Sequence, residues 1–523
     1  MARRRAVSSQ PGSRAVASPP HLRRRGNATQ LIVDGKPFIM LAGELHNSSA
    51  SSLDYMAPIW ERMAALGLNT VLAPLYWESI EPDEGRFDFS LVDGLIDGAR
   101  AHGQRLVFLW FATWKNAVSS YAPAWVKTDG RRFFRAHLET GERAHTISAL
   151  SREACEADAR AFAAVMRHIR QADGRRRTVL MMQVENETGI LKTPRDHSPA
   201  AEAAFRKRVP DELMSALAKW RDELTPEFKA IWAASDFRES GTWFETFGGD
   251  ADEVFMAWHT SRYVDRVAAA GKAEYGLPMY ANAWLVHPNS PKPGQYPSGG
   301  PVPKMLDVWR AGAPHVDALA PDIYLPDFRS MCAAYAKPWN PLVIPEARRD
   351  ERCAATAFYA LAEHDAVCFA PFGIDDLQPP HPLADTYRLL AEIAPLLADH
   401  HGQGTMAGFC QQADKETWER GLGGFHVTVE PRSPLQEGAV PAGGLIVALA
   451  PDEFLIAGRN LKISFTSRDP ERPNTDYLWL DEGRFEKGKW IPGRRLNGDE
   501  SGHGRWVSLD RSLKTLKVKV YCY

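Results

Sequence analysis

The chain lacks the sequence features of several large classes of protein. Its six Cys residues are scattered without CxxC spacing, which argues against a zinc site and against a disulfide-stabilised scaffold. There is no run of about 18 apolar residues that could span a membrane, and no GxGxxG or GxSxG motif follows an apolar run. We therefore expect no membrane segment, no dinucleotide-binding domain and no Ser/His/Asp hydrolase.

The body of the chain lacks an excess of basic residues and is mildly acidic. The formal net charge is −2, but residues 1–26 contain seven Arg and no Asp, Glu or Lys, which leaves −9 for the rest. Without clustered Lys and Arg on the folded part, nucleic acid is not an expected partner. We predict that residues 1–26 form a disordered basic arm.

The N-terminus also lacks the apolar core of an export signal, so the sequence predicts a cytoplasmic protein, or a periplasmic one if the start codon is misplaced.

Strand-like and helix-like segments alternate over most of the chain. Apolar runs end near Gly43, Leu75, Trp110, Gln183, Asn282, Asp322, Pro345 and Pro371, and helix-forming segments separate them. Eight such units, with polar residues after the strands and none before, predict an α/β fold, the TIM (β/α)8 barrel, over residues 27–395. A helical insertion is expected near 197–272. A doubly wound open sheet is the alternative, but no phosphate-binding loop supports it.

The pattern of alternating strand-like and helix-like segments ends at residue 395. Short β-rich runs separated by Gly, Pro and Asp turns predict a C-terminal all-β, sandwich-like domain over residues 396–523. We expect this domain to pack on the barrel, and a carbohydrate-binding module is the alternative.

Two apolar runs end in carboxylates. VLMMQVENETG at 179–189 carries Glu185 and Glu187, and PLVIPEARRD at 341–350 carries Glu346. Buried ionisable groups are costly unless they are paired or used, so both places are candidates for chemistry. In a barrel the loops after the strands form one pocket, and two facing carboxyl groups there suit glycoside hydrolysis. From the pattern alone, either Glu185 or Glu187 could be the acid.

Other side chains near the predicted strand ends are candidates for substrate binding. Aromatic faces at such positions can stack on a sugar ring. His46 has no second His or Cys at ligand spacing, so we interpret it as a hydrogen-bonding pocket residue and predict neither a metal nor a cofactor. With His46, the candidates are Trp77, Glu78, Trp110, Trp114, Trp284 and Tyr324.

Several motifs together resemble those of a known family. They are GELHN at 43–47, NTVLAPLYWESIEPDEGRFDF at 69–89, QVENETG at 183–189, LPMYANAWL at 277–285, VIPEARRD at 343–350 and FAPFGIDD at 369–376. In them the sequence resembles the clan A glycoside hydrolases, and within the clan the family 35 β-galactosidases, especially bacterial members with a small C-terminal β domain.

This resemblance implies a cofactor-free, retaining and exo-acting β-glycosidase, with β-galactosidase as the expected activity. It implies that Glu187 is the acid/base, because Glu187 directly follows Asn186, which in the clan binds the sugar 2-hydroxyl. Glu346 would be the nucleophile, and Tyr324 would donate a hydrogen bond to it. The family usually has an aromatic residue where this chain has Thr188, so the neighbouring subsite is expected to differ.

Two rival functions stay open at this point. One is a clan A enzyme of another specificity, such as a β-glucosidase, β-glucuronidase, α-L-arabinofuranosidase or mannanase. The other is a sugar-binding protein without catalysis, against which the presence of both Glu residues and Asn186 argues. The expected partner is a small carbohydrate or oligosaccharide, and a homo-oligomer is compatible with the sequence.

Overall fold

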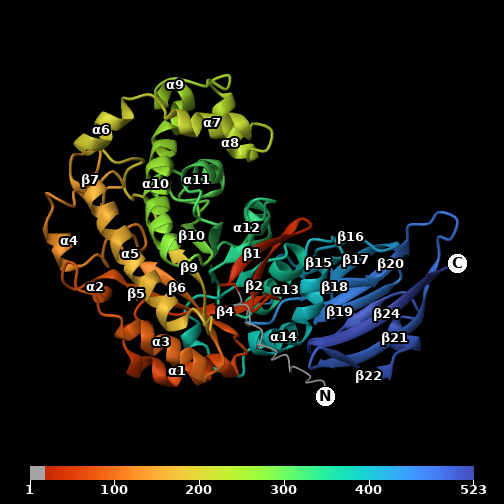
Figure 1. Ribbon diagram of the computed structural model, residues 1–523. Coiled ribbons are helices and arrows are strands. Elements are labelled where there is room, and N and C mark those ends of the chain that lie inside the picture. The colour runs from red at the N-terminus through yellow and green to blue at the C-terminus, as the bar shows by residue number, and fades with distance from the viewer. Residues whose placement is uncertain (1–17, 437) are drawn as a thin grey trace, which may run out of the picture.

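The computed structural model describes residues 18–436 and 438–523. A barrel of parallel strands surrounded by helices forms the larger part of the molecule, and a C-terminal domain of antiparallel strands lies beside it (Figure 1). None of the helices in the described ranges combines the length and the apolar character that a membrane-spanning segment requires.

Parallel strands form the wall of the barrel. They are β4 (Met40–Glu44), β5 (Thr70–Tyr76), β6 (Arg105–Phe111), β9 (Val179–Val184), β10 (Met279–Trp284), β11 (Ala318–Ile323), β12 (Val343–Ile344), β13 (Glu346–Ala347) and β14 (Cys368–Phe369). β12 and β13 are two halves of one strand, split at Pro345, which has no backbone N–H to donate. Because β12 pairs with β14 and β13 pairs with β11, the split strand closes a ring of eight strands within the described residues, and the predicted TIM-barrel fold is confirmed.

Helices follow the strands and cover the outside of the barrel (Figure 1). Their apolar residues recur at helical spacing; in α5, for example, Phe162, Val165, Met166 and Ile169 are all buried. The helices are α1 (Leu53–Ala65), α2 (Trp77–Ile80), α3 (Ser90–Ala101), α4 (Ala124–Thr128), α5 (Arg152–Asp173), α10 (Ala251–Glu274), α11 (Leu306–Gly312), α12 (Phe328–Tyr335), α13 (Cys353–Glu363) and α14 (Pro382–His400). The short hairpin of β7 (Arg135–His137) and β8 (Arg143–Ile147) lies between α4 and α5.

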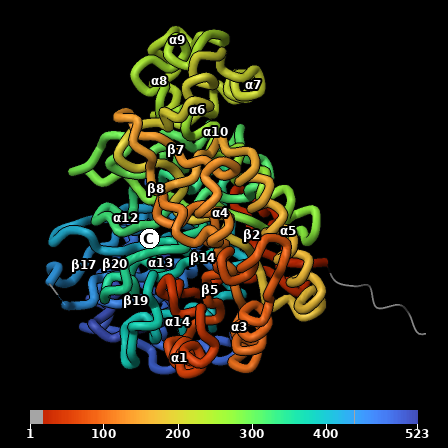
Figure 2. Tube along the Cα trace, turned by 90° about the vertical axis from the view of Figure 1, so that its left-hand side faces the viewer, coloured from red at the N-terminus to blue at the C-terminus, as the bar shows by residue number. Residues whose placement is uncertain are grey.

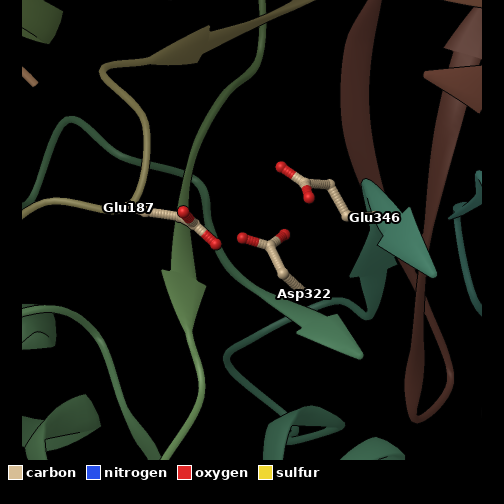
Figure 3. Close-up of side chains that lie close together, drawn as sticks. All are labelled: Glu187, Asp322 and Glu346. Carbon is tan, nitrogen blue, oxygen red and sulfur yellow. The ribbon is translucent and has the colours of Figure 1, made fainter. Parts of the chain in front are cut away.

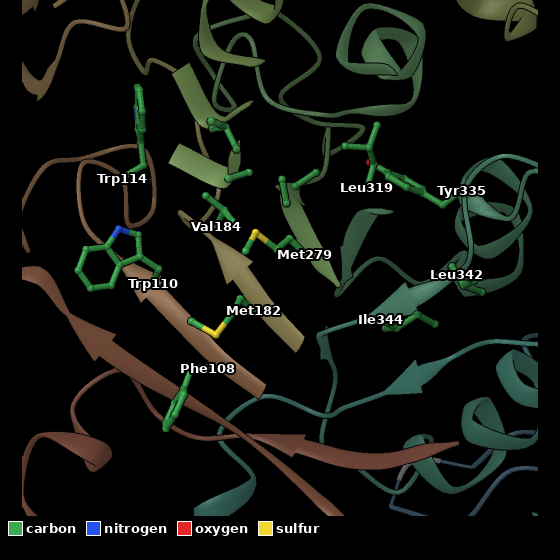
Figure 4. Packing of buried hydrophobic residues seen from close by; sticks show 14 of the residues in the cluster. Phe108, Trp110, Trp114, Met182, Val184, Met279, Leu319, Tyr335, Leu342 and Ile344 are labelled. Atoms are coloured by element: carbon green, nitrogen blue, oxygen red, sulfur yellow. The ribbon is translucent and has the colours of Figure 1, made fainter. Parts of the chain in front are cut away.

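Two separate apolar cores support the barrel. One lies between strands and helices and includes Phe108, Trp110 and Met182 (Figure 4). The other fills the barrel interior and includes Leu109 and Tyr280. Successive strand residues point to opposite faces, so each strand contributes to both cores. The filled interior makes the barrel a packed support for the loops at its C-terminal end.

A small sheet precedes the barrel and corrects one prediction. β1 (His21–Arg25) pairs antiparallel with β2 (Ala28–Val33), and β2 pairs with β3 (Lys36–Phe38). The prediction of a disordered arm over residues 1–26 is therefore wrong for His21–Arg25, and residues 1–17 lie outside the described residues. The strand is ordered because Leu22 packs on the interior core and Arg25 donates a hydrogen bond to the carbonyl oxygen of Asp399.

Between β9 and β10 the chain forms a helical insertion that rises above the barrel (Figures 1 and 2). It contains α6 (Pro199–Phe205), α7 (Asp211–Lys219), α8 (Pro226–Ala233) and α9 (Trp243–Phe247), and α10 leads back to the barrel. Buried Trp232 and Trp243 form part of its apolar core. Side-chain caps by Ser198, Thr225 and Thr242 begin three of its helices, so its fold is encoded locally.

The C-terminal domain consists of two antiparallel sheets with a shared apolar core, as expected for the predicted sandwich-like domain. One sheet has the order β15 (Met406–Cys410), β18 (Gly443–Ala450), β19 (Glu453–Arg459), β24 (Lys514–Cys522), β21 (Thr475–Glu486) and β22 (Lys489–Arg495). The other has the order β16 (Trp418–Leu422), β17 (Phe425–Pro431), β20 (Leu461–Ser467) and β23 (Val507–Leu509). The boundary predicted after residue 395 falls inside α14, which continues to His400.

Two glycines let the C-terminal domain approach the barrel closely. A Cβ atom on Gly408 of β15 would lie 2.8 Å from the Phe358 carbonyl oxygen and 2.8 Å from the Tyr359 Cα in α13. A Cβ atom on Gly443 of β18 would lie 2.5 Å from the Ala355 Cβ of the same helix. Helix and sheet therefore meet at backbone distance, with no room for a side chain.

We predict that Gly408→Ala lowers the free energy of unfolding by about 1–3 kcal/mol, because the added methyl group meets backbone atoms that cannot turn aside. Urea unfolding followed by tryptophan fluorescence measures the change. Gly424→Ala is the matched control, because a Cβ atom on Gly424 would lie 3.5 Å from the Pro451 carbonyl oxygen, in ordinary contact. Equal midpoints for the two variants would contradict the close approach described above.

Candidate active site

Three carboxylates converge on one cavity at the C-terminal end of the barrel (Figure 3). Glu187 follows β9, Asp322 lies in β11 and Glu346 begins β13. One carboxylate oxygen of each lies within 4.8 Å of the other two. The cavity has a volume of about 420 Å³ and is also lined by Asn47, Lys115, Asn116, Trp284, Leu285, His287, Tyr324, Leu325 and Phe372.

Glu187 is held by its backbone and by its side chain. Its φ of 46° lies in the left-handed region, which a non-glycine residue adopts at a cost that is common at functional sites. Its N–H donates to Asn282 Oδ1 at 3.0 Å, and its Oε2 accepts from Asn116 Nδ2 at 2.5 Å. Burial, and after it the charge of Glu346, raises the pKa of Glu187 to about 7.

Glu346 accepts hydrogen bonds at both carboxylate oxygens. The hydroxyl of Tyr324 donates to Oε2 at 2.5 Å, and Asn186 Nδ2 lies 3.5 Å from Oε1. Behind it, Glu44 ends β4, and burial followed by the charge of Glu346 raises the pKa of Glu44 well above its usual value. The protonated form of Glu44 is therefore favoured, so Glu44 adds little negative charge beside Glu346.

Asp322 is the third carboxyl group of the cluster. Its Oδ2 accepts from Asn282 Nδ2 at 2.7 Å, so Asn282 links Asp322 with the backbone of Glu187. Burial, and then the charges of Glu346 and Glu187, raises the pKa of Asp322 well above its usual value. The three oxygens could hold a cation by geometry, but the ammonium group of Lys115 already supplies a positive charge at the same cavity.

A tight turn after β6 carries two further side chains of the cavity. The backbones of Lys115 and Val118 exchange hydrogen bonds of 3.0 and 3.1 Å, and Asn116 and Ala117 between them have φ of 52° and 58°. Ala117 N–H also donates to the carbonyl oxygen of Glu187 at 3.0 Å. The turn is thus fixed to the residue that its Asn116 side chain contacts.

Glu185 lies beside this cavity without entering it. Its Oε2 accepts from the backbone N–H of Trp114 at 2.6 Å, and its carboxyl group meets that of Asp158 in α5. Asp158 Oδ2 accepts from Thr113 Oγ1 at 2.9 Å and from Tyr263 at 3.2 Å. Burial, and then Asp158, raises the pKa of Glu185 well above its usual value. Glu185 therefore anchors the loop after β6 from behind.

Three of the tryptophans predicted to bind substrate do not reach the cavity. Trp77, Trp110 and Trp114 are fully buried in the core between strands and helices, where Figure 4 shows the last two. Their indole N–H groups donate to Glu81, to Asp158 and to the carbonyl oxygen of Gly189, respectively. The prediction is wrong for these three, because their side chains point outward from the barrel wall.

Two polar candidates also lie elsewhere. Glu78 pairs with Lys127 at 2.9 Å and is not among the residues that line the cavity. His46 Nε2 lies 2.8 Å from Asp376 Oδ2, and His46 lines a neighbouring depression. Trp284 and Tyr324 do line the cavity and are 38% and 40% exposed.

Sequence reasoning missed several side chains of the site. Asn282 and Asp322 stand at predicted strand ends, two residues before Trp284 and Tyr324, but their contacts with Glu187 depend on the closed barrel and are not visible in the sequence. Lys115 and Asn116 follow β6 directly after Trp114, and the turn that directs them into the cavity is not visible in the sequence. The missed residues are Glu44, Lys115, Asn116, Asn282 and Asp322.

Comparison with protein families gives two matches. Residues 51–230 match the model of glycoside hydrolase family 42, described as beta-galactosidase. The matching family is number 42, not number 35. Residues 383–508 match a domain of unknown function, DUF5597, which covers α14 and most of the C-terminal sheets. One segment of the chain is therefore similar to glycoside hydrolase family 42 and a second segment to a separate C-terminal domain, and the prediction of family 35 is not supported.

Known proteins show more distant likeness. Over 168 residues the chain is 29% identical to a beta-galactosidase of Xanthomonas manihotis, and the match covers 31% of this chain and 25% of that protein. A beta-galactosidase structure from the psychrophilic Marinomonas ef1 is 15% identical, with 69% of this chain and 60% of that chain covered and a TM-score of 0.47. The catalytic domain of a beta-amylase from Paenibacillus polymyxa is 10% identical, with 67% and 97% covered and a TM-score of 0.47.

Proposed function

We propose that the protein is a retaining, exo-acting β-galactosidase that hydrolyses terminal β-galactosides through a covalent glycosyl-enzyme intermediate. The observation that carries this proposal is the pair Glu187 and Glu346, of which one carboxylate oxygen each lies within 4.8 Å of the other in the cavity. Carboxyl groups in retaining enzymes are about 5–5.5 Å apart, whereas inverting enzymes need about 6.5–9.5 Å to admit a water molecule.

The environments of the two carboxyl groups support different roles. Glu187, whose pKa is raised to about 7, holds a proton near neutral pH and is assigned as the general acid. Glu346, with donors at both oxygens, is assigned as the nucleophile. Glu346 attacks the anomeric carbon while Glu187 protonates the departing oxygen. In the second step Glu187 takes a proton from water, and the resulting hydroxide displaces Glu346.

Neighbouring side chains position the sugar in this scheme. Asn186 Nδ2, close to Glu346 Oε1, is placed to bind the 2-hydroxyl next to the anomeric carbon. Tyr324 orients Glu346, and Trp284 offers a partly exposed aromatic face on which the leaving group can stack. The match of residues 51–230 to a beta-galactosidase model supports galactose as the sugar. We propose carbohydrate as the sole substrate class, with no cofactor.

A panel of nitrophenyl glycosides tests the function. We expect the β-galactoside to be hydrolysed with the highest kcat/KM and the product to be released first as the β-anomer, as proton NMR can record. Preference for a β-glucoside, β-glucuronide, α-L-arabinofuranoside or β-mannoside would overturn galactose but keep glycoside hydrolysis. Binding of galactosides without hydrolysis would favour a sugar-binding protein instead.

Activity is expected to fall above about pH 7. Glu187 must carry a proton to act as the acid, and its pKa of about 7 means that this proton is lost as the pH rises through that value. We predict a basic limb in kcat/KM near pH 7, with a decrease of about tenfold per pH unit above it. The measurement is kcat/KM from pH 4 to 9 with a poorly activated galactoside.

The variant Asn116→Ala serves as a directional test of this assignment. The hydrogen bond from the Asn116 side chain favours the carboxylate form of Glu187 and so lowers the pKa of Glu187. Removal of this bond should raise that pKa and move the basic limb to higher pH. A basic limb that stays in place in Asn116→Ala would argue that another group controls it.

A further inference from the structure

Among the described residues that line the cavity, Lys115 is the one lysine or arginine. Its side chain is 3% exposed, and its ammonium nitrogen lies 4.7 Å from the centroid of the Phe111 ring. In the part of the chain that the structure describes, no carboxylate oxygen lies within 4.0 Å of that nitrogen. An ammonium group has three N–H donors, and none of them forms a hydrogen bond to the described residues, so the site favours a ligand that supplies acceptors to it.

The charges around Lys115 indicate which acceptors fit. Glu44, Glu187, Asp322 and Glu346 all act on it electrostatically. Burial and neighbouring charges favour the protonated forms of Glu44 and Asp322, so the carboxylate of the proposed nucleophile Glu346 is the main negative charge that acts on Lys115. A sugar carboxylate bound here would place a second negative charge beside Glu346. The repulsion between the two carboxylates would disfavour binding of such a sugar next to Lys115. Neutral hydroxyl oxygens can accept from the ammonium group without that repulsion.

We infer that Lys115 donates hydrogen bonds to ring hydroxyl groups of a neutral hexose bound against Glu346, and that Lys115 is thereby a specificity-determining residue of this cavity. The inference rests on the proposed function, since it places the sugar by the roles of Glu187 and Glu346. The turn of residues 115–118 makes this possible. It directs Asn116 to Glu187 and Lys115 into the same cavity, so the acid and the hydroxyl-binding group are positioned by one structural unit.

A double-mutant cycle between protein and substrate tests the contact directly. The partners are Lys115→Met and the 2-, 3-, 4- and 6-deoxy analogues of a nitrophenyl β-galactoside, with kcat/KM as the readout. For the parent galactoside we expect Lys115→Met to lower kcat/KM by roughly 10- to 150-fold, the loss typical of a hydrogen bond to a charged donor. For the analogue that lacks the contacted hydroxyl, Lys115→Met and wild type should agree within about threefold, because the interaction is already absent.

Lys127→Met is the matched control. Lys127 pairs with Glu78 outside the cavity. The Lys127→Met variant should therefore have the same kcat/KM as the wild type for the parent galactoside and for every analogue. Thermal unfolding of both variants shows whether they are folded. If Lys115→Met does not fold, Lys115→Gln keeps most of the side-chain length without the charge, and the same cycle is run with it.

The possible outcomes separate the inference from the proposed function. If Lys115→Met lowers kcat/KM by the same factor for the parent galactoside and for all four deoxy analogues, the role of Lys115 is overturned, while the proposed function stands. Faster turnover of a β-galacturonide or β-glucuronide than of the neutral sugars would overturn the neutral substrate class. A wild-type protein that hydrolyses no glycoside would overturn the proposed function and this inference together.

Discussion

Replacing Glu346 by glutamine is expected to lower kcat for a nitrophenyl β-galactoside by roughly 10⁴-fold or more. A glutamine amide has nearly the same shape but cannot form the ester bond of a glycosyl-enzyme intermediate. Tyr324 and Asn186 can still contact the side chain at this position, so the cavity is expected to keep its shape. Steady-state kinetics and galactose binding by calorimetry measure the two effects separately.

A mechanism-based fluorosugar provides the direct readout for Glu346. The wild type should accumulate one covalent adduct, which peptide mapping is expected to locate on Glu346, and the Glu346→Gln variant should remain unlabelled. Glu61→Gln, an exposed change on α1, is the control and should be labelled as the wild type is. A label on Asp322 or Glu187 would contradict the assignment of the nucleophile.

Replacing Glu187 by alanine is expected to act on the two chemical steps differently. A galactoside with a poor leaving group needs the proton of Glu187, so its kcat/KM should fall roughly 10²- to 10⁴-fold. A dinitrophenyl galactoside departs without protonation, and its kcat/KM should fall far less. Its kcat should still be low, because the second step lacks the base that activates water. A burst of dinitrophenol before the steady state would record this difference.

Azide should rescue Glu187→Ala. The small anion needs no base, and the space left by the carboxyl group admits it next to the anomeric carbon, so β-galactosyl azide is the expected product. Glu185→Ala is the matched comparison, because Glu185 lies behind the cavity and contacts Trp114 and Asp158. Azide rescue of Glu185→Ala instead of Glu187→Ala would reverse the assignment of the acid.

The alternation of apolar runs and helical segments was sufficient to predict the barrel. Parallel strands buried on both faces must be apolar throughout, so β5, β6 and β9 are legible as uninterrupted runs. The positions of Glu187 and Glu346 followed from the same reasoning, since polar residues at strand ends can face only one end of the barrel. Residues His21–Arg25 were not recognisable as a strand because their order depends on contacts with β2 and the barrel core.

The direction of each side chain at a strand end was not predictable from the pattern. Trp110 and Trp114 shortly precede the cavity residue Lys115 in the sequence, yet their indole rings lie in the core outside the barrel wall. Lys115, one residue after Trp114, enters the cavity because the turn to Val118 reverses the chain. A shift of one residue in such a loop exchanges core and cavity positions, and local sequence does not encode that register.

By itself, the sequence determined the barrel, the β-rich C-terminal domain and the two carboxylates proposed for catalysis, because burial imposes an apolar periodicity that only a few polar residues interrupt. Only the tertiary structure decided which neighbours those carboxylates have. Glu44, Asp322 and Lys115 come from three different strand ends, and they come close to Glu187 and Glu346 only when the barrel closes. The shifted pKa of Glu187 is therefore a property of the closed barrel, since it arises from burial and from charges remote in sequence.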